Sequence, residues 1–281
     1  MPVGLLLLAA GLAATVVLGP LGLNVLVWRV SAIGLNQTYG ADAASLVVVV
    51  PTAVVTAWLW RRRSPLASPL ALGVGMATLY YAVASVMGPD YIRYSGNNER
   101  FFPLLLALIV LSWTISAQAW SGLARPPQLA RWLVRSLGIV LVLGGAAIGL
   151  AWLKQILELT LTGTFSTPSD LAAYTDAPGG FWIVRIVDLG FIVPLSVATG
   201  FGLWRGSLTA LKAAYGVTAF LVLQATSVLA MGVIMLLRQD PTATPALVVA
   251  LAPIWLGLIV LTAILFVSSS RTSSSAVAGS P

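Results

Sequence analysis

Residues 245–267 read PALVVALAPIWLGLIVLTAILFV, and this run contains no charged side chain. A helix needs about 20 apolar residues to cross the hydrocarbon core of a bilayer. Further runs of similar composition lie near residues 3–28, 43–60, 67–88, 102–124, 133–157, 181–204 and 207–237. We therefore predict an all-α polytopic transmembrane helix bundle with about eight spans.

The overall composition supports a membrane protein. Of the 281 residues, 59% are hydrophobic and 8% are charged, whereas a soluble domain carries about 25% charged residues. We predict that residues 1–267 form the transmembrane bundle. The small polar residues of 268–281 predict a disordered cytoplasmic tail.

Two residue types are missing, and their absence limits the chemistry. The chain has no His and no Cys, so it lacks the commonest ligands of haem, zinc and iron–sulfur clusters. We expect no metal site and no cofactor. The basic pI suggests nucleic acid, but the positive-inside bias of membrane proteins is the better explanation, so we expect no nucleic-acid partner.

The charges separate by sign along the predicted helix order. With an even number of spans, one side receives nine basic residues: Arg61, Arg62, Arg63, Arg125, Arg131, Arg135, Arg205, Lys212 and Arg271. All acids fall toward the other side: Asp42, Asp90, Glu99, Glu158, Asp170, Asp176, Asp188 and Asp240. The positive-inside rule then predicts that both termini are cytoplasmic, in a bacterial cytoplasmic (inner) membrane.

Two predicted spans resemble each other. Val50-Pro51 precedes Trp60-Arg61 in one span, and Val193-Pro194 precedes Trp204-Arg205 in another. This echo predicts a weak four-plus-four parallel repeat. The alternative is that Trp and Arg are ordinary anchors at the membrane interface.

The most informative polar residues are Arg185 and Asp188, which are three apart and so share a helix face within a predicted span. Charged groups inside a membrane are expensive and must meet each other, water or a partner helix. Gly190 and Pro194 follow, and they permit close backbone approach and a kink. The pair predicts a binding or proton-handling site; the alternative is a buried ion pair that locks the helix into the bundle.

Other candidates lie at a similar depth on the same side. Asp42 and Glu99 lie near predicted helix starts, where the alternative role is capping. Lys154 and Glu158 are four apart on one helix, where the alternative is snorkelling to the interface. The predicted set of binding residues consists of these four residues together with Tyr39, Arg100, Arg185 and Asp188. We expect Asp42, Glu99, Lys154, Arg185 and Asp188 to be buried in one polar cluster, with the loop 159–180 either a lid over it or an ordinary solvated loop.

Three segments resemble recurring stretches of an uncharacterised family of bacterial multi-pass membrane proteins. They are Gly40-Ala-Asp42 with Leu46 and Pro51, Asn97-Asn-Glu-Arg-Phe-Phe102 with Leu111-Ser112, and Val187-Asp188-Leu-Gly190-Phe-Ile-Val-Pro194. The resemblance covers residues 40–237 and implies a helical membrane fold of unknown activity.

Three functions follow from these features. The first is a protein that binds or transports a small molecule or a membrane lipid through a polar pocket in the outer leaflet. The second is an accessory or structural subunit that binds other membrane subunits. The third is a membrane enzyme using paired carboxylates, which is the least favoured.

Overall fold

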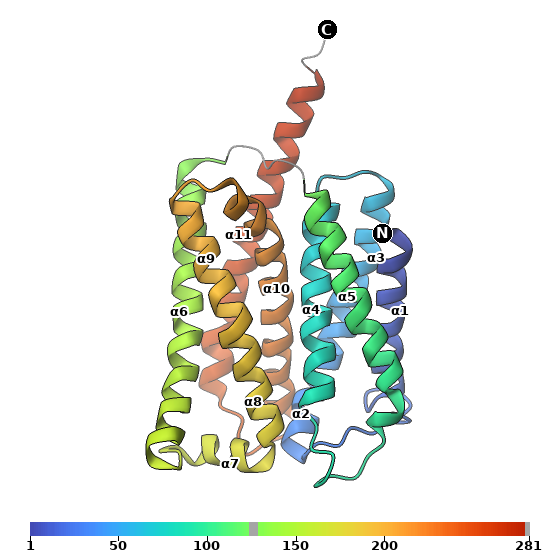
Figure 1. Cartoon of the computed structure of the whole chain (residues 1–281), viewed down its shortest axis with the longest axis vertical. Helices are drawn as coiled ribbons and strands as arrows, with labels where there is room; N and C mark the ends of the chain where they lie inside the picture. Colours follow the sequence, from blue (N-terminus) through green and yellow to red (C-terminus); the bar gives the residue numbers. More distant parts are fainter. Residues whose placement is uncertain (124–128, 279–281) are drawn as a thin grey trace.

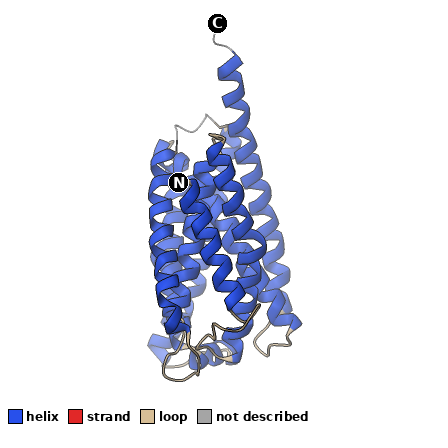
Figure 2. Cartoon of the chain, turned by 90° about the vertical axis from the view of Figure 1, so that its right-hand side faces the viewer, coloured by secondary structure: helices blue, strands red, loops and turns tan. Residues whose placement is uncertain are grey.

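The helices run side by side along one axis and form a single elongated bundle (Figures 1 and 2). The computed structural model describes residues 1–123 and 129–278, except for the side chains of residues 247 and 269–278, and these described residues contain no β-strand. Within them, seven helices are long and apolar enough to cross a membrane, and an eighth apolar helix is shorter. The predicted all-α polytopic bundle is therefore confirmed.

The first half of the chain contains α1 (Pro2–Leu18), α2 (Ala32–Ala44), the π-helical turn η1 (Ser45–Val49), α3 (Val50–Arg61), α4 (Ala67–Met87), the 3-10 turn η2 (Asn98–Phe101) and α5 (Phe102–Gly122). The second half contains α6 (Arg131–Thr162), α7 (Pro168–Asp176), α8 (Pro178–Val187), the π-helical turn η3 (Asp188–Ile192), α9 (Val193–Trp204), α10 (Leu208–Leu237) and α11 (Pro245–Ala278).

The predicted first span, 3–28, is wrong in its second half, because α1 ends at Leu18. Gly19 adopts an extended conformation, and Pro20 follows with no backbone N–H to continue the helix. At about 1.5 Å per residue, α1 falls short of the roughly 30 Å of a bilayer core. The loop after it packs Leu26 and Trp28 against Leu105.

The predicted second span, 43–60, begins too late. The helix already starts at Ala32, where the side chain of Ser31 accepts a hydrogen bond from the N–H of Gly34 at 3.0 Å and caps the first turn. Asn36 is tolerated in this helix because it has long-range partners. Its side chain donates to Asp240 at 2.8 Å and accepts from Arg238 at 2.6 Å.

Both helices that contain the Val-Pro pairs widen by a π-helical turn just before the proline. The N–H of Val50 donates to the carbonyl of Ser45, and the N–H of Val193 donates to that of Asp188. A proline inside a helix lacks an N–H and its ring meets the carbonyl one turn earlier. The wider turn lets the helix continue through this disruption.

These turns belong to a longer internal repeat with a constant sequence interval. The number of residues from the start of η1 to the start of η3 is the same as the number from Arg63 to Gly206. Both Arg63 and Gly206 have a positive φ, 52° and 71°. The same interval separates Ser64 from Ser207, whose N–H groups donate back to Leu59 and Gly202. The first residues of α5 and α11 differ by it as well. Because corresponding helices run in the same direction (Figure 1), the repeat is parallel.

The two halves meet where α4 crosses α10, which pack together in the centre. A Cβ added to Gly73 would lie 2.7 Å from the Cβ of Ala219, and one added to Gly216 would lie 2.3 Å from a methyl of Leu72. Gly73 and Gly216 are equivalent in the repeat. Glycine at both positions permits this close helix–helix contact, as is common in membranes.

Acidic and basic residues are distributed unequally between the two ends of the bundle, as predicted, with Arg29, Arg93 and Arg238 lying among the acidic residues. The turn after α3, with Arg61 to Arg63, lies at the same end as the N-terminus (Figure 1), whereas the acidic loop segments lie at the opposite end. Arg125 and residues 279–281 lie outside the described residues. The backbone of 268–278 continues α11 past the other helices (Figure 2), in the segment where the composition predicted a disordered tail.

Candidate functional site

Asp188 lies at the centre of a polar cluster contributed by three helices. It is the first residue of η3, and only 8% of it is exposed. One carboxylate oxygen accepts a hydrogen bond from the hydroxyl of Tyr80 on α4 at 3.2 Å. The other accepts from the indole N–H of Trp152 on α6 at 2.7 Å. Both oxygens are therefore partnered by neutral donors.

Arg185 lies one turn earlier on α8 and is held between aromatic rings. The carbon of its guanidinium lies 3.6 Å from the ring centre of Phe181 and 4.3 Å from that of Trp152. Nη2 donates to Gln155 at 2.5 Å, and Nη1 donates to the backbone carbonyl of Phe181 at 3.2 Å. The buried Nε has no hydrogen-bond partner.

Arg185 and Asp188 do not form the ion pair considered as an alternative. Within the described part of the chain, the one salt bridge joins Arg29 to Glu99. The rings and Gln155 hold the guanidinium, while Tyr80 and Trp152 occupy the carboxylate. The cluster thus presents an unpaired cation and an unpaired acid on one helix face.

The segment 159–180 folds over the outer end of this cluster. Its middle forms α7, capped by the side chain of Thr167. Asp170 of α7 accepts a hydrogen bond at 3.0 Å from the same Gln155 that binds Arg185. Phe165 and Tyr174 both pack edge to face against Phe181. The segment is therefore folded and attached to α6 through Gln155, rather than a loop without structure.

Asp42 forms a second buried acidic position on the other side of Tyr80. It is fully buried, and one of its oxygens accepts a hydrogen bond at 2.7 Å from Tyr81, the next residue of α4. Its other oxygen, Oδ2, is buried and has no partner. Asp42 and Asp188 thus bind neighbouring tyrosines of one central helix.

The remaining predicted site residues lie elsewhere, so the prediction of one cluster is wrong. Glu99 is about half exposed and pairs with Arg29 at 2.7 Å. Arg100 and Lys154 are exposed. Tyr39 lies under Arg238 with 4.3 Å between the guanidinium carbon and the ring centre, and Glu158 accepts a hydrogen bond from the N–H of Ser166.

The physical reason is that the loop after α1, expected to be part of a helix, supplies its own polar contacts. Arg29 from this loop binds Glu99 and the carbonyl of Tyr94. Asn97 fastens the same loop by bonding the backbone of Val25 and Val27. Glu99 therefore pairs with Arg29 at the surface and does not join Asp188.

The sequence interpretation did not include Trp152, Tyr80 or Tyr81 among the site residues. A signal for Trp152 exists: it precedes Gln155 by three residues, so both share a face of α6. The sequence does not say which neighbouring helix that face meets.

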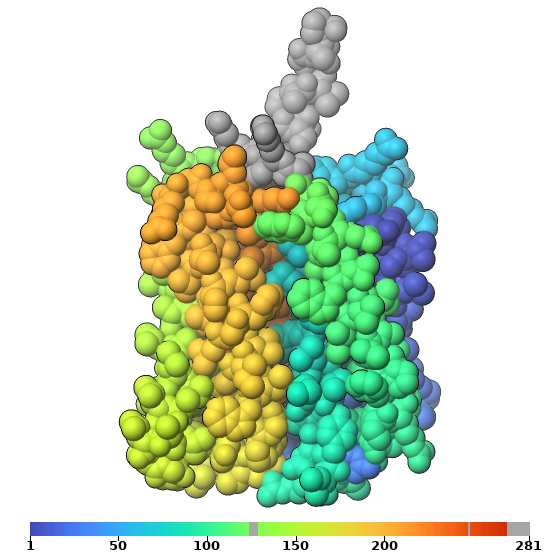
Figure 3. Space-filling model, viewed as in Figure 1, coloured from blue at the N-terminus to red at the C-terminus, as the bar shows by residue number. Residues whose placement is uncertain are grey.

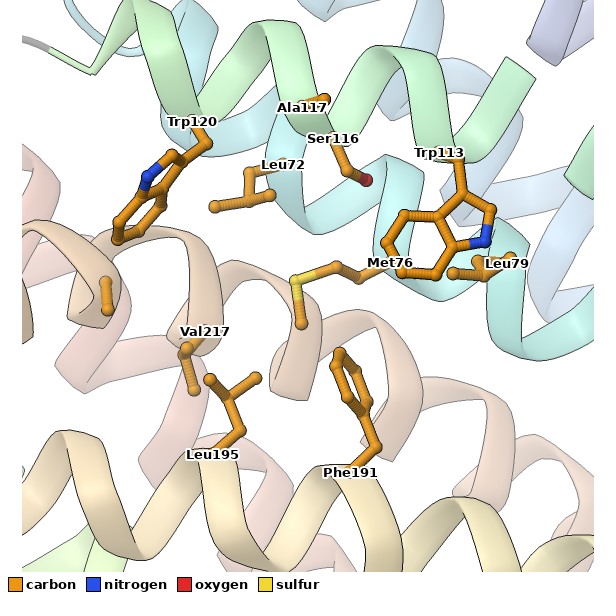
Figure 4. A pocket seen from close by; sticks show the side chains of 11 residues that line it. Leu72, Met76, Leu79, Trp113, Ser116, Ala117, Trp120, Phe191, Leu195 and Val217 are labelled. Carbon is orange, nitrogen blue, oxygen red and sulfur yellow. The ribbon is translucent and has the colours of Figure 1, made fainter. Parts of the chain in front are cut away.

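An apolar groove separates the two halves on one flank of the bundle. It has a volume of about 280 Å³ and is lined by Leu72, Met76, Leu79, Trp113, Ser116, Ala117, Trp120, Phe191, Leu195, Ala213 and Val217. Met76, Trp113 and Phe191 border the same space from three segments (Figure 4). In the space-filling view, α4 is visible between α5 and the α8–α9 column (Figure 3). Lys212 lies 4.8 Å from the ring centre of Trp120 at this groove.

No group of three or more Asp or Glu side chains that could hold a metal ion occurs within residues 1–123 and 129–278. Comparison of the chain with models of protein families, with curated proteins and with solved structures gave no match. The resemblance to an uncharacterised bacterial membrane family therefore stays a prediction, and the candidate function rests on the geometry above.

Proposed function

We propose that this chain is a transporter that binds a small molecule carrying an anionic group at the Arg185–Asp188 cluster and moves it across a bacterial cytoplasmic membrane. The observation that carries this proposal is the state of Arg185. Its guanidinium is half-buried and stacked between two rings, and no acidic side chain of the described residues lies within salt-bridge distance of it.

The chemistry of the cluster indicates the class of ligand. A buried cation needs a compensating anion, and the free Nε of Arg185 offers an additional donor to it. Guanidinium groups bind carboxylates and phosphates through paired N–H donors. Asp188 and Trp152 lie beside it and offer contacts for a polar or cationic part of the same ligand.

The architecture favours transport over simple binding. Many transporters consist of repeated halves with interrupted helices that line the substrate site. Here both interrupted helices carry a buried acid, Asp42 or Asp188, at or just before the π-helical turn. The positive-inside rule favours a cytoplasmic position for the end of the bundle that carries the basic turn with Arg61 to Arg63.

The test compares the native chain with two single variants in detergent. A panel of small carboxylates and phosphate esters is screened for compounds that raise the melting temperature. A compound that stabilises the native chain should also stabilise Lys154→Gln, an exposed cation on α6, but should leave Arg185→Gln unchanged. Equal stabilisation of all three proteins, or none by any anionic compound, would overturn the assignment of Arg185.

Uptake is then measured in proteoliposomes with the stabilising compound as the radiolabelled solute. The native chain and Lys154→Gln should accumulate it, while Arg185→Gln should not. Binding without uptake by the native chain would contradict transport and leave a binding protein.

A second candidate, lipid handling, is favoured by the apolar groove. Its lining accepts an acyl chain, and Lys212 at Trp120 offers a cation for a lipid phosphate. Native mass spectrometry of gently extracted protein distinguishes the candidates. A phospholipid retained by the native chain and lost in Lys212→Gln supports lipid handling, whereas co-migrating protein partners indicate a subunit of a larger complex.

A further inference from the structure

We infer that Asp42 and Tyr81 form a proton-binding site inside the membrane, separate from the Arg185–Asp188 cluster, in which Asp42 carries a proton at neutral pH. This inference concerns a different residue pair and does not depend on the proposed transport of an anionic compound.

The burial of Asp42 is the first step of the argument. The residue is 0% exposed and lies within the apolar helix Ala32–Arg61. An ionised carboxylate in such surroundings is strongly destabilised unless a cation or several hydrogen bonds compensate it. Asp42 receives one hydrogen bond, from Tyr81, and its Oδ2 receives none.

No cation of the surrounding elements compensates Asp42. α2 and η1 pack against α1, α4 and α10. The first two of these helices contain no Lys or Arg, and the one basic residue of α10, Lys212, lies in its first turns and stacks on Trp120. Beyond the end of α10, Arg238 is bound to Asn36 and Tyr39. The remaining titratable group that contacts Asp42 is the neutral phenol of Tyr81.

The C-terminal end of α1 further destabilises the ionised form of Asp42. A Cβ on Gly19, the residue that ends α1, would lie 3.5 Å from Oδ2 of Asp42. The carboxyl group therefore lies beside the carbonyl end of a helix, which carries partial negative charge. That end disfavours a carboxylate and so favours the protonated form of Asp42.

The backbone beside Asp42 is suited to hold a neutral acid tightly. Gly40 lies against the backbone of Met231, because a Cβ there would be 2.3 Å from its Cα. This contact leaves water little access from the α10 side. Exchange of a proton on Asp42 from this side then requires that the contact between α2 and α10 opens.

Infrared spectroscopy of the full chain reconstituted in lipid tests the inference. At neutral pH the native protein should show the carbonyl stretch of a protonated carboxylic acid, and slow transfer into heavy water should shift it. Asp42→Asn should remove this band. Asp90→Asn, at a partly exposed acid in the loop after α4 whose pKa is lowered by hydrogen bonds from the N–H groups of Arg93 and Ile92, is the control and should retain it.

If Asp42→Asn does not fold, Tyr81→Phe provides the test. Removal of the phenol should shift the frequency of the same band, whereas Tyr91→Phe, in an outer loop, should not. Three results would overturn the inference: a band that persists in Asp42→Asn, loss of an ionised carboxylate band in that variant, or a native band that appears only when sodium is removed.

Discussion

Replacement of Gly40 by Ala should separate α2 from α10 and destabilise the whole bundle. The new Cβ would lie 2.3 Å from the Cα and 2.5 Å from the N of Met231. These are backbone atoms of a helix, so no side-chain rotation relieves the overlap. Because ordinary contacts begin near 3.4 Å, the helices must part by about 1 Å in an interior that packs at crystal density.

The magnitude follows from two contributions. Overpacking of this kind costs about 1–3 kcal/mol. The same displacement stretches the hydrogen bonds of Asn36 to Asp240 and Arg238, one turn away on α2, and each is worth about 0.5–1.5 kcal/mol or more for charged partners. We expect a loss of about 2–4 kcal/mol in the free energy of unfolding.

The assay is unfolding of the purified chain by SDS in mixed micelles, followed by circular dichroism. Gly144→Ala is the matched control, because a Cβ at Gly144 of α6 would have no atom within 4 Å; it should change the free energy of unfolding by at most about 1 kcal/mol. Equal unfolding curves for the two variants would refute the close contact of α2 with α10.

Three other predictions concern the loops and the orientation. On this Cys-free background, an impermeant maleimide added to intact cells should label Ser169→Cys and not Ser64→Cys, and the reverse would contradict the proposed orientation. Burial raises the pKa of Asp240, but the hydrogen bonds from Asn36 and Thr242 outweigh it and hold that pKa below its ordinary value. The stability from these bonds should thus be complete above about pH 4 and be lost as the pH falls further. A protection factor of the Thr242 amide against hydrogen exchange that does not change with pH would refute this. Asn97→Ala removes the bonds to Val25 and Val27 and should destabilise by about 1–3 kcal/mol in the SDS assay. An unchanged free energy of unfolding would contradict the role of Asn97 in holding this loop.

Several features followed from the sequence because they depend on local composition or on spacing along one helix. Long apolar runs form helices in lipid because a helix satisfies its backbone hydrogen bonds within its own segment. The Val-Pro pairs marked the two interrupted helices, and the repeat they predicted recurs in η1 and η3. The shared helix face of Arg185 and Asp188 also follows from their three-residue spacing.

Other features depended on contacts between distant segments. Leu18 ends α1 although the apolar run continues, because Gly19 and Pro20 interrupt the backbone and Leu26 and Trp28 pack on Leu105 instead. The sequence also did not indicate which partner each charged side chain would have. Arg29 pairs with Glu99, and Arg185 stacks on aromatic rings instead of pairing with Asp188.

The sequence by itself thus determined the helical membrane fold, the charge asymmetry and the internal repeat, since hydropathy and helix periodicity act within one segment at a time. Only the tertiary structure decided that Tyr80 and Tyr81 bind two different acids and that Asp42 is left without a cation. The physical reason is that a side chain's partner depends on which faces of separate helices meet, and in lipid those faces are chosen by close packing, as at Gly73 and Gly216, not by hydrophobicity.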